Sequence, residues 1–184
     1  MFRTLAALVA ASLALSACAV VNVSDNTFAE PPRYDTTVPK IEAGIVGVDG
    51  ETIGLVRLTQ APVGVLGDVK LEPGSITPGW HGLHLHQVGD CSDIGTFKLS
   101  GGHLGLIPDG HGLLNPIGPE AGDLPNLYAF ADGSATMEFF TTLTSLSSIA
   151  DADGSALIIH QNRDDHITQP IGGAGPRVGC AVLK

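Results

Sequence analysis

The sequence predicts an all-β protein, a β-sandwich or barrel of about eight strands with two long functional loops. The 184 residues include 24 Gly and 12 Pro but only 15% charged residues, which is typical of turn-rich β proteins. Short apolar runs alternate with turn signals, and no long amphipathic helical pattern interrupts them. The length suits one domain with appendages.

The expected strands follow one another from residue 41 onward. They are the apolar runs 44–48, 52–58, 65–71, 82–86, 135–141 and 155–160. Dipeptides typical of hairpin turns, such as Asp49-Gly50 and Asp132-Gly133, separate several of them.

Two stretches break this spacing and are predicted to be long loops. Residues 89–127 show almost no alternation and are rich in Gly, Pro, Asp and His, and residues 161–177 contain an acidic pair and end in Gly-Pro-Arg. A loop this long inside a compact domain is usually functional or cross-linked.

The first 17 residues are typical of an export signal. Arg3 supplies the positive charge, and the apolar run 5–15 is too short to span a bilayer. The run ends in Leu15-Ser16-Ala17-Cys18, which resembles the lipobox of bacterial lipoproteins, where the signal is removed and the Cys is acylated. An ordinary cleaved signal with an incidental Cys is the alternative.

Residues 18–40 are polar and contain proline, and we expect them to form a flexible tether between a lipidated Cys18 and a domain over residues 41–184. The predicted location is therefore the periplasmic side of the cell envelope, anchored to a membrane. Ala19, in place of Asp, favours the outer membrane.

The charge balance argues against a nucleic-acid partner. The chain has 9 Lys and Arg against 19 Asp and Glu, a net charge of −10, which opposes binding to a polyanion. An anionic substrate would need local positive charge to reach its site.

If Cys18 carries lipid, Cys91 and Cys180 remain as an even pair. A disulfide between them is expected in an oxidising compartment. Two buried free thiols are the alternative.

Two histidines, His84 and His86, alternate with leucines on a predicted strand and so share one face of a sheet. Imidazole suits copper or zinc, although one such pair is weak support because surface strands carry it by chance. Further candidate ligands lie elsewhere in the chain, and they are His103, His111, Asp123 and His160.

From Ile41 to Leu183 the chain resembles the Cu/Zn superoxide dismutase family. The motifs that carry the resemblance are His81-Gly82-Leu83-His84-Leu85-His86, Gly89-Asp90-Cys91-Ser92, Gly101-Gly102-His103, His111-Gly112-Leu113-Leu114-Asn115-Pro116, Ala121-Gly122-Asp123-Leu124-Pro125-Asn126, Ile159-His160 and Arg177-Val178-Gly179-Cys180. The resemblance implies a Greek-key fold, copper and zinc as cofactors, and dismutation of superoxide to O₂ and H₂O₂ at a redox-cycling copper.

Position by position, the resemblance assigns copper to His84, His86, His103 and His160. It assigns zinc to His103, His111 and Asp123. His103 would be the imidazolate shared by both metals, with a catalytic role in proton transfer, and Asp164 would hydrogen-bond one histidine of each site. Arg177 would attract the superoxide anion at the mouth of the copper channel, and Cys91 and Cys180 match the family's disulfide.

One position departs from the family. The fourth zinc ligand is usually a histidine, but this chain has Glu120 there. Glu120 could bind zinc through oxygen, which is our expectation. Alternatively it faces solvent and leaves a weakened zinc site.

Two function classes follow, an enzyme and a non-catalytic copper and zinc buffer on the same fold. Arg177 favours the enzyme, because a buffer has no use for a residue that guides anions. His81 is expected to bond to backbone and His166 to lie at the surface. The sequence leaves open the oligomeric state, with a homodimer as one possibility.

Overall fold

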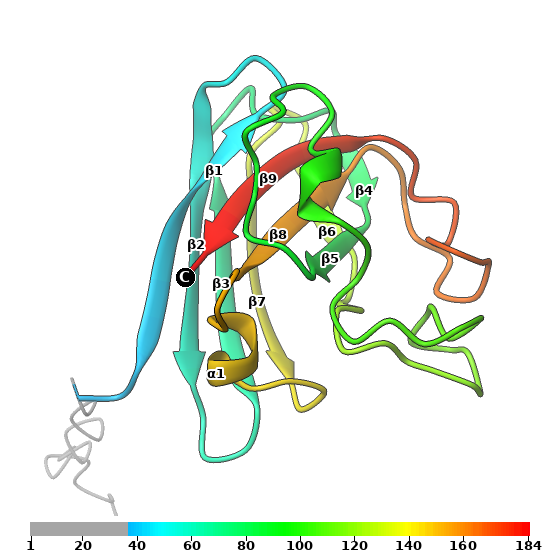
Figure 1. Ribbon diagram of the computed structural model, residues 1–184. Coiled ribbons are helices and arrows are strands. Elements are labelled where there is room, and N and C mark those ends of the chain that lie inside the picture. Colours follow the sequence, from blue (N-terminus) through cyan, green and yellow to red (C-terminus); the bar gives the residue numbers. More distant parts are fainter. Residues whose placement is uncertain (1–36) are drawn as a thin grey trace, which may run out of the picture. The chain divides into compact units, whose positions relative to one another are not determined.

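The computed structural model describes residues 37–184 (Figure 1). The predicted export signal, Cys18 and the tether up to residue 36 lie outside the described residues. The elements are β1 (Lys40–Gly47), β2 (Thr52–Gln60), β3 (Val65–Leu71), β4 (Gly79–His81), β5 (Leu83–His86), the 3-10 helix η1 (Lys98–Ser100), β6 (Leu127–Ala129), β7 (Ala135–Thr141), α1 (Leu146–Ile149), β8 (Ser155–His160) and β9 (Arg177–Leu183).

Seven strands form one curled antiparallel sheet in the order β5-β8-β9-β1-β2-β3-β7, while β4 and β6 pair separately. The predicted all-β class is confirmed, and β3, β7 and β8 cover the predicted ranges. The strands β4 and β6 were not predicted, because each has three residues and so offers no period to detect. Among the described residues no helix is both long and apolar enough to cross a membrane.

The main core fills the concave side of the sheet. In β3 the residues Val65, Val69 and Leu71 are buried and alternate with partly or fully exposed positions, as expected for a sheet with one packed face. Gly67 lies under the ring of Phe139, where an added Cβ would come within 2.2 Å of a ring carbon. Only glycine leaves room for that ring.

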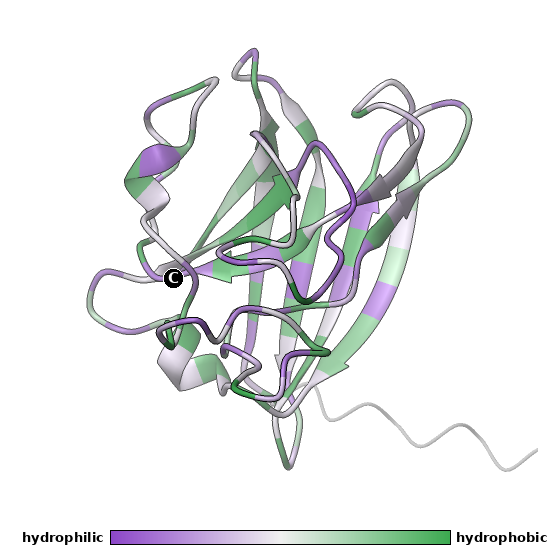
Figure 2. Ribbon diagram, turned by 90° about the vertical axis from the view of Figure 1, so that its right-hand side faces the viewer, coloured by the Kyte–Doolittle hydropathy of each residue, from purple (hydrophilic) through white to green (hydrophobic). Residues whose placement is uncertain are grey.

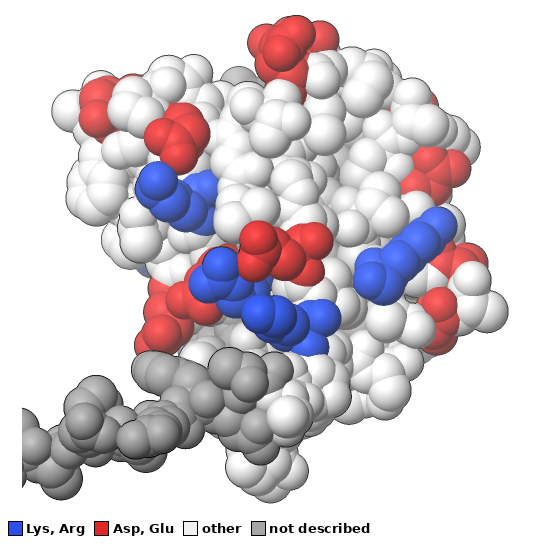
Figure 3. All heavy atoms as spheres, turned by 90° about the vertical axis from the view of Figure 1, so that its left-hand side faces the viewer, with Lys and Arg blue, Asp and Glu red and all other residues white. Residues whose placement is uncertain are grey.

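The convex side of the sheet around β1 to β3 is solvated. Figure 3 shows basic and acidic side chains beside one another on this side of the molecule. Exposed pairs such as Arg57 with Glu42, at 2.8 Å, and Lys70 with Glu72, at 3.0 Å, join neighbouring positions. Such pairs add little stability, and their positive charges are already matched by carboxylates.

The outer face of β5, β8 and β9 is different, because the long loop over residues 87–126 covers it. Leu83 and Leu85 point into the main core, and the alternate residues His84 and His86 are buried under the loop. The part of the first loop after η1 and the second loop lie on the same side of the molecule, at the right in Figure 1 and toward the viewer in Figure 2, where polar and apolar residues mix along them.

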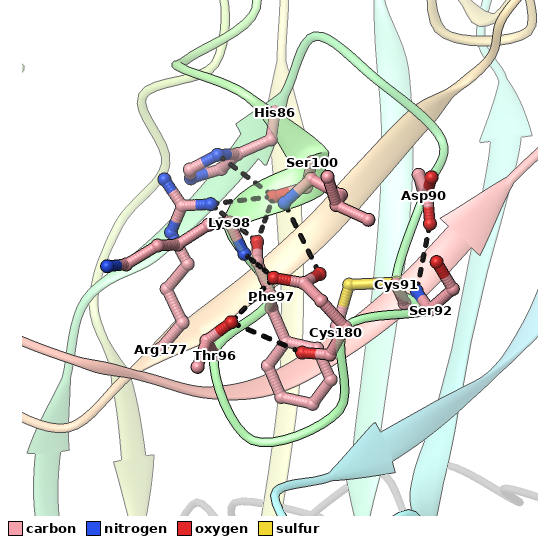
Figure 4. Close-up of a disulfide and its surroundings, with 12 residues drawn as sticks. His86, Asp90, Cys91, Ser92, Thr96, Phe97, Lys98, Ser100, Arg177 and Cys180 are labelled. Carbon is pink, nitrogen blue, oxygen red and sulfur yellow. Dashed lines mark hydrogen bonds between the residues drawn. A yellow bond between two sulfur atoms is a disulfide. The ribbon is translucent and has the colours of Figure 1, made fainter.

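A second, smaller core fixes this loop to the sheet. It contains Cys91 and Phe97 from the loop, Ala156 and Ile158 from β8, and Cys180 from β9. Cys91 and Cys180 form a disulfide across 89 positions (Figure 4), as predicted, so the alternative of two free thiols is wrong. Closing a loop of that length stabilises the fold by roughly 4 to 5 kcal/mol on the chain-entropy model.

Candidate metal centre

Backbone pairing brings the first set of histidines together on the outer face. His84 pairs with Ile158 of β8, and His160 ends that strand at a shift in register. An isolated bridge pairs His86 with His103 of the long loop, and another pairs His84 with Asp123. Three distant segments therefore place imidazoles beside one another.

Four nitrogens in this set have no hydrogen-bond partner although they are buried. They are His84 Nδ1, His86 Nε2, His103 Nε2 and His160 Nε2, and all lie within 4.8 Å of one another. Buried polar atoms nearly always have a partner. Four lone pairs that converge without one fit a copper ion, for which imidazole is a preferred donor.

The opposite nitrogen of each ring is held in place. His84 Nε2 lies 2.7 Å from Asp164, His86 Nδ1 donates to the Gly101 carbonyl at 2.9 Å and His160 Nδ1 donates to the Gly175 carbonyl at 2.9 Å. A carbonyl only accepts, so these two bonds place the proton on Nδ1 and leave the lone pair of Nε2 free. Such outer partners fix tautomer and orientation in metal sites.

A second cluster shares His103. Its members are His103, His111, Glu120 and Asp123, all buried and with donor atoms within 4.8 Å of one another. His103 Nδ1 lies 2.8 Å from Glu120 Oε2 and 3.4 Å from Asp123 Oδ1, and His111 Nδ1 lies 2.8 Å from the same Asp123 oxygen. Two imidazoles and two carboxylates in one place fit zinc.

Glu120 does not face solvent, since only 3% of it is exposed. The alternative of an outward-facing side chain is therefore wrong. Its second oxygen, Oε1, accepts a hydrogen bond from the Ile107 N–H at 3.0 Å, so the carboxylate also fixes the segment that follows His103.

Asp164 lies between the two clusters, as the resemblance implies. Its Oδ2 contacts His84 Nε2 at 2.7 Å and its Oδ1 contacts His111 Nε2 at 3.2 Å. Burial alone would raise the pKa of Asp164, but the hydrogen bonds with His111 and His84 hold that pKa well below its usual value. The carboxylate stays charged.

The protonation of the two clusters differs. Burial lowers the pKa of His84 to about 4 and that of His160 to about 3, and burial also lowers the pKa of His86. These rings are neutral at neutral pH and ready to bind metal. Burial also acts to lower the pKa of His111, but Asp123 and Asp164 outweigh it and raise that pKa to about 9.

Arg177 lies beside the first cluster, half-buried. Its guanidinium donates to the Phe97 carbonyl at 2.5 Å, to Ser100 Oγ at 2.9 Å and to the Gly101 carbonyl at 2.8 Å, and Figure 4 shows it next to His86. No carboxylate among residues 37–184 forms an ion pair with it, so its positive charge is available to an anion.

A cavity of about 320 Å³ joins these groups to the surface. His86, His103 and Arg177 line it, together with apolar side chains of both long loops, which are Leu106, Ile107, Pro108, Pro170 and Ile171. A small anion that enters would meet the guanidinium and the converging nitrogens together.

For three other residues near the site, the sequence offers a weak indication of their position or none. His81 Nδ1 lies 2.8 Å from the His160 carbonyl oxygen and Nε2 lies 2.7 Å from the Thr77 carbonyl oxygen, and these backbone contacts agree with a structural role. His166 is half-buried and lies 2.9 Å from Asn126, so its expected surface position is wrong. Gln169 contacts the backbone of His111, and nothing in the sequence around it pointed to this.

The family model described as copper/zinc superoxide dismutase (SODC) matches residues 52–183. A superoxide dismutase [Cu-Zn] of Caulobacter vibrioides is 50% identical over 143 residues, which cover 74% of this chain and 80% of that protein. A second relative, superoxide dismutase [Cu-Zn] 1 of Aquifex aeolicus, is 38% identical over 151 residues, which cover 79% of this chain and 88% of that protein.

Solved structures agree. A double mutant of a superoxide-dismutase-like protein from Bacillus subtilis superimposes with a TM-score of 0.72 and 36% identity, over 77% of this chain and 95% of that chain. The Cu/Zn superoxide dismutase of Brucella abortus superimposes with a TM-score of 0.65 and 28% identity, over 79% of this chain and 100% of that chain. With a family match that spans residues 52–183, the chain belongs to the copper/zinc superoxide dismutase family.

Proposed function

We propose that the protein is a superoxide dismutase that converts two superoxide anions and two protons into O₂ and H₂O₂. The observation that carries this is the convergence of four buried, unpartnered imidazole nitrogens beside the unpaired guanidinium of Arg177. Relatives named as Cu-Zn superoxide dismutases support the same activity.

The residues divide between two metals. His84, His86, His103 and His160 would hold copper, and His103, His111, Glu120 and Asp123 would hold zinc. Copper, when bound, supplies one-electron redox chemistry, and zinc, which is redox-inert, organises its ligands.

Arg177 and His103 would act on the substrate. The guanidinium is permanently charged and faces the cavity, so it attracts the anion against the negative charge of the whole chain. His103 is the one imidazole with a nitrogen in each cluster, and its Nε2 can hold a proton whenever that nitrogen is not coordinated. On the other side of the ring, Nδ1 lies 2.8 Å from Glu120 and 3.4 Å from Asp123, the two carboxylates that would hold zinc together with this nitrogen.

A copper and zinc buffer without turnover is the second candidate. It uses the same ligands, but it gives no role to Arg177, whose hydrogen bonds to Phe97, Ser100 and Gly101 aim its charge at the cavity. The enzyme is therefore the better account.

We also propose that the enzyme is an envelope lipoprotein that protects this compartment from external superoxide. The charge of Arg3, the short apolar run 5–15 and the Leu-Ser-Ala-Cys motif at Cys18 support an acylated N-terminus. Acyl chains contribute about 0.8 kcal/mol per buried CH₂, so more than one chain holds a protein firmly to a membrane.

Replacing Arg177 by Ala should lower kcat/KM at least about tenfold, because the anion loses its steering charge. Steady-state dismutation assays on copper-loaded protein, at several ionic strengths, measure this. Arg163→Ala is the matched control, since it removes the same charge from a side chain that lies over Trp80 and outside the cavity. Equal losses in both variants would assign the effect to net charge, and a copper-loaded wild type at background activity would favour the buffer.

Replacing Glu120 by Gln should weaken zinc binding at least about tenfold, since the size and the acceptor for Ile107 stay while the charge goes. Glu120→His should keep zinc through the family's usual imidazole and lose the Ile107 hydrogen bond. Competition with a chromophoric chelator and elemental analysis of the Cu:Zn ratio measure both. Unchanged zinc affinity in Glu120→Gln would remove Glu120 from the ligand set.

The metal-free protein should be most stable near pH 6.5. The unfolded chain protonates its histidines near pH 6.5, above the lowered pKa values of His84, about 4, and His160, about 3. The free energy of unfolding therefore falls as the pH drops from about 6.5 toward 3. His111 acts oppositely: its raised pKa of about 9 stabilises the fold below pH 6.5, and this contribution is lost as the pH rises toward 9. Urea unfolding across this range tests the maximum, and a flat profile would contradict it.

Replacing Cys18 by Ala should move the expressed protein from the membrane fraction to the soluble fraction, because no acyl chain can be attached. Fractionation and labelling with a palmitate analogue measure this in a bacterial host. Ser16→Ala, within the same motif, should keep both label and membrane association. Persistent membrane association of the Cys18→Ala variant would refute the lipid anchor.

A further inference from the structure

The two long loops meet over the metal centre, and each gives a carboxamide to the other. From the first loop, Asn126 Nδ2 donates to the Asp164 carbonyl at 2.9 Å, and Asn126 Oδ1 accepts from the Asp164 N–H at 2.9 Å. One side chain thus binds both backbone groups of Asp164, the residue that contacts His84 and His111.

Gln169, in the second loop, does the same in the opposite direction. Its Oε1 accepts from the His111 N–H at 3.2 Å, and its Nε2 donates to the His111 carbonyl at 2.9 Å and to the Ile167 carbonyl at 2.9 Å. The ring of His111 is bound at Nδ1 by Asp123 and at Nε2 by Asp164. Gln169 therefore fixes the backbone of His111, whose ring is already fixed at both nitrogens.

We propose that Gln169 is a positioning residue for the zinc site, which it serves through His111 and never by touching the metal. The position of the His111 ring depends on its backbone as well as on the partners of its two ring nitrogens. Gln169 holds that backbone from the second loop. Gln169 also lines the cavity beside Pro170 and Ile171, so one residue links zinc geometry to the channel wall. The proposal rests on the proposed function only in the identity of the metal.

The chain offers a matched control in Gln60. Its Nε2 donates to the carbonyls of Ala61 and Gly64 at 2.8 and 2.9 Å, and its Oε1 accepts from the Leu146 N–H at 3.0 Å. It makes the same number of backbone hydrogen bonds as Gln169, at the end of β2 and with no metal ligand among its partners. Gln60→Ala therefore reports the stability cost of losing such a set of bonds.

The test compares Gln169→Ala, Gln169→Glu and Gln60→Ala in the full-length protein with copper loaded. Glu keeps the length and the acceptor for the His111 N–H but cannot donate to the two carbonyls. Zinc release to a chromophoric chelator should be about tenfold faster in both Gln169 variants. The visible spectrum of Co(II) placed in the zinc position should also shift. Gln60→Ala should leave both readouts at the wild-type values.

A measurement without metal keeps the proposal falsifiable if the wild type takes up no zinc. Amide hydrogen exchange at His111 should be faster in Gln169→Ala than in Gln60→Ala at equal global stability. Wild-type zinc release and an unshifted Co(II) spectrum in both Gln169 variants would overturn the proposal, as would unchanged His111 exchange in metal-free protein. Absence of dismutation with these effects present would overturn only the proposed function.

Discussion

The structure depends on keeping four imidazole lone pairs buried and free of hydrogen bonds. A buried nitrogen without a partner is costly, so each ring must be held by its other side, as Asp164, Gly101 and Gly175 hold His84, His86 and His160. The barrel core could not do this, because it offers no polar partners. His84, His86 and His160 lie instead on the outer face of β5 and β8, and His103 comes from the first long loop. The long loops supply both the hydrogen-bond partners and the cover.

The disulfide also helps to hold the first long loop over the imidazoles, although it lies away from them. It joins Cys91 to β9 in a small core with Phe97, and the carbonyl of Phe97 binds the guanidinium of Arg177. Asp93 accepts hydrogen bonds from the backbone of Lys98 and Leu99, which orders the same turn. Arg177 is thus aimed by carbonyls and a hydroxyl, none of which neutralises its charge. A carboxylate in their place would hold the side chain equally well and remove its attraction for an anion.

Several strand positions and the disulfide could be predicted, because strands show a local alternation of apolar residues and the cysteines lie in recognisable motifs. The motifs also named the histidines and carboxylates that the structure brings together. The ranges 65–71, 135–141 and 155–160 match because strands of six or seven residues with turn signals around them show alternation. The strands β4 and β6 and the contacts of Gln169 with His111 could not be predicted. The short strands have no period, and a carboxamide that bonds to backbone in another loop leaves no pattern in sequence. His166 was misplaced for the same reason, because its burial depends on Asn126, forty positions earlier.

Glu120 adds a third carboxylate to the site. Together with Asp123 and Asp164 it puts three buried carboxylates around His111 and His103, where the family's usual residue leaves two. Buried anions at this spacing need a cation among them. In the metal-free protein a proton on His111 supplies this positive charge, because Asp123 and Asp164 raise the pKa of His111 to about 9. A divalent ion neutralises the cluster more fully than that proton can. The carboxylate therefore strengthens the electrostatic demand for a metal at this position, while its second oxygen, on Ile107, keeps the cavity wall in register.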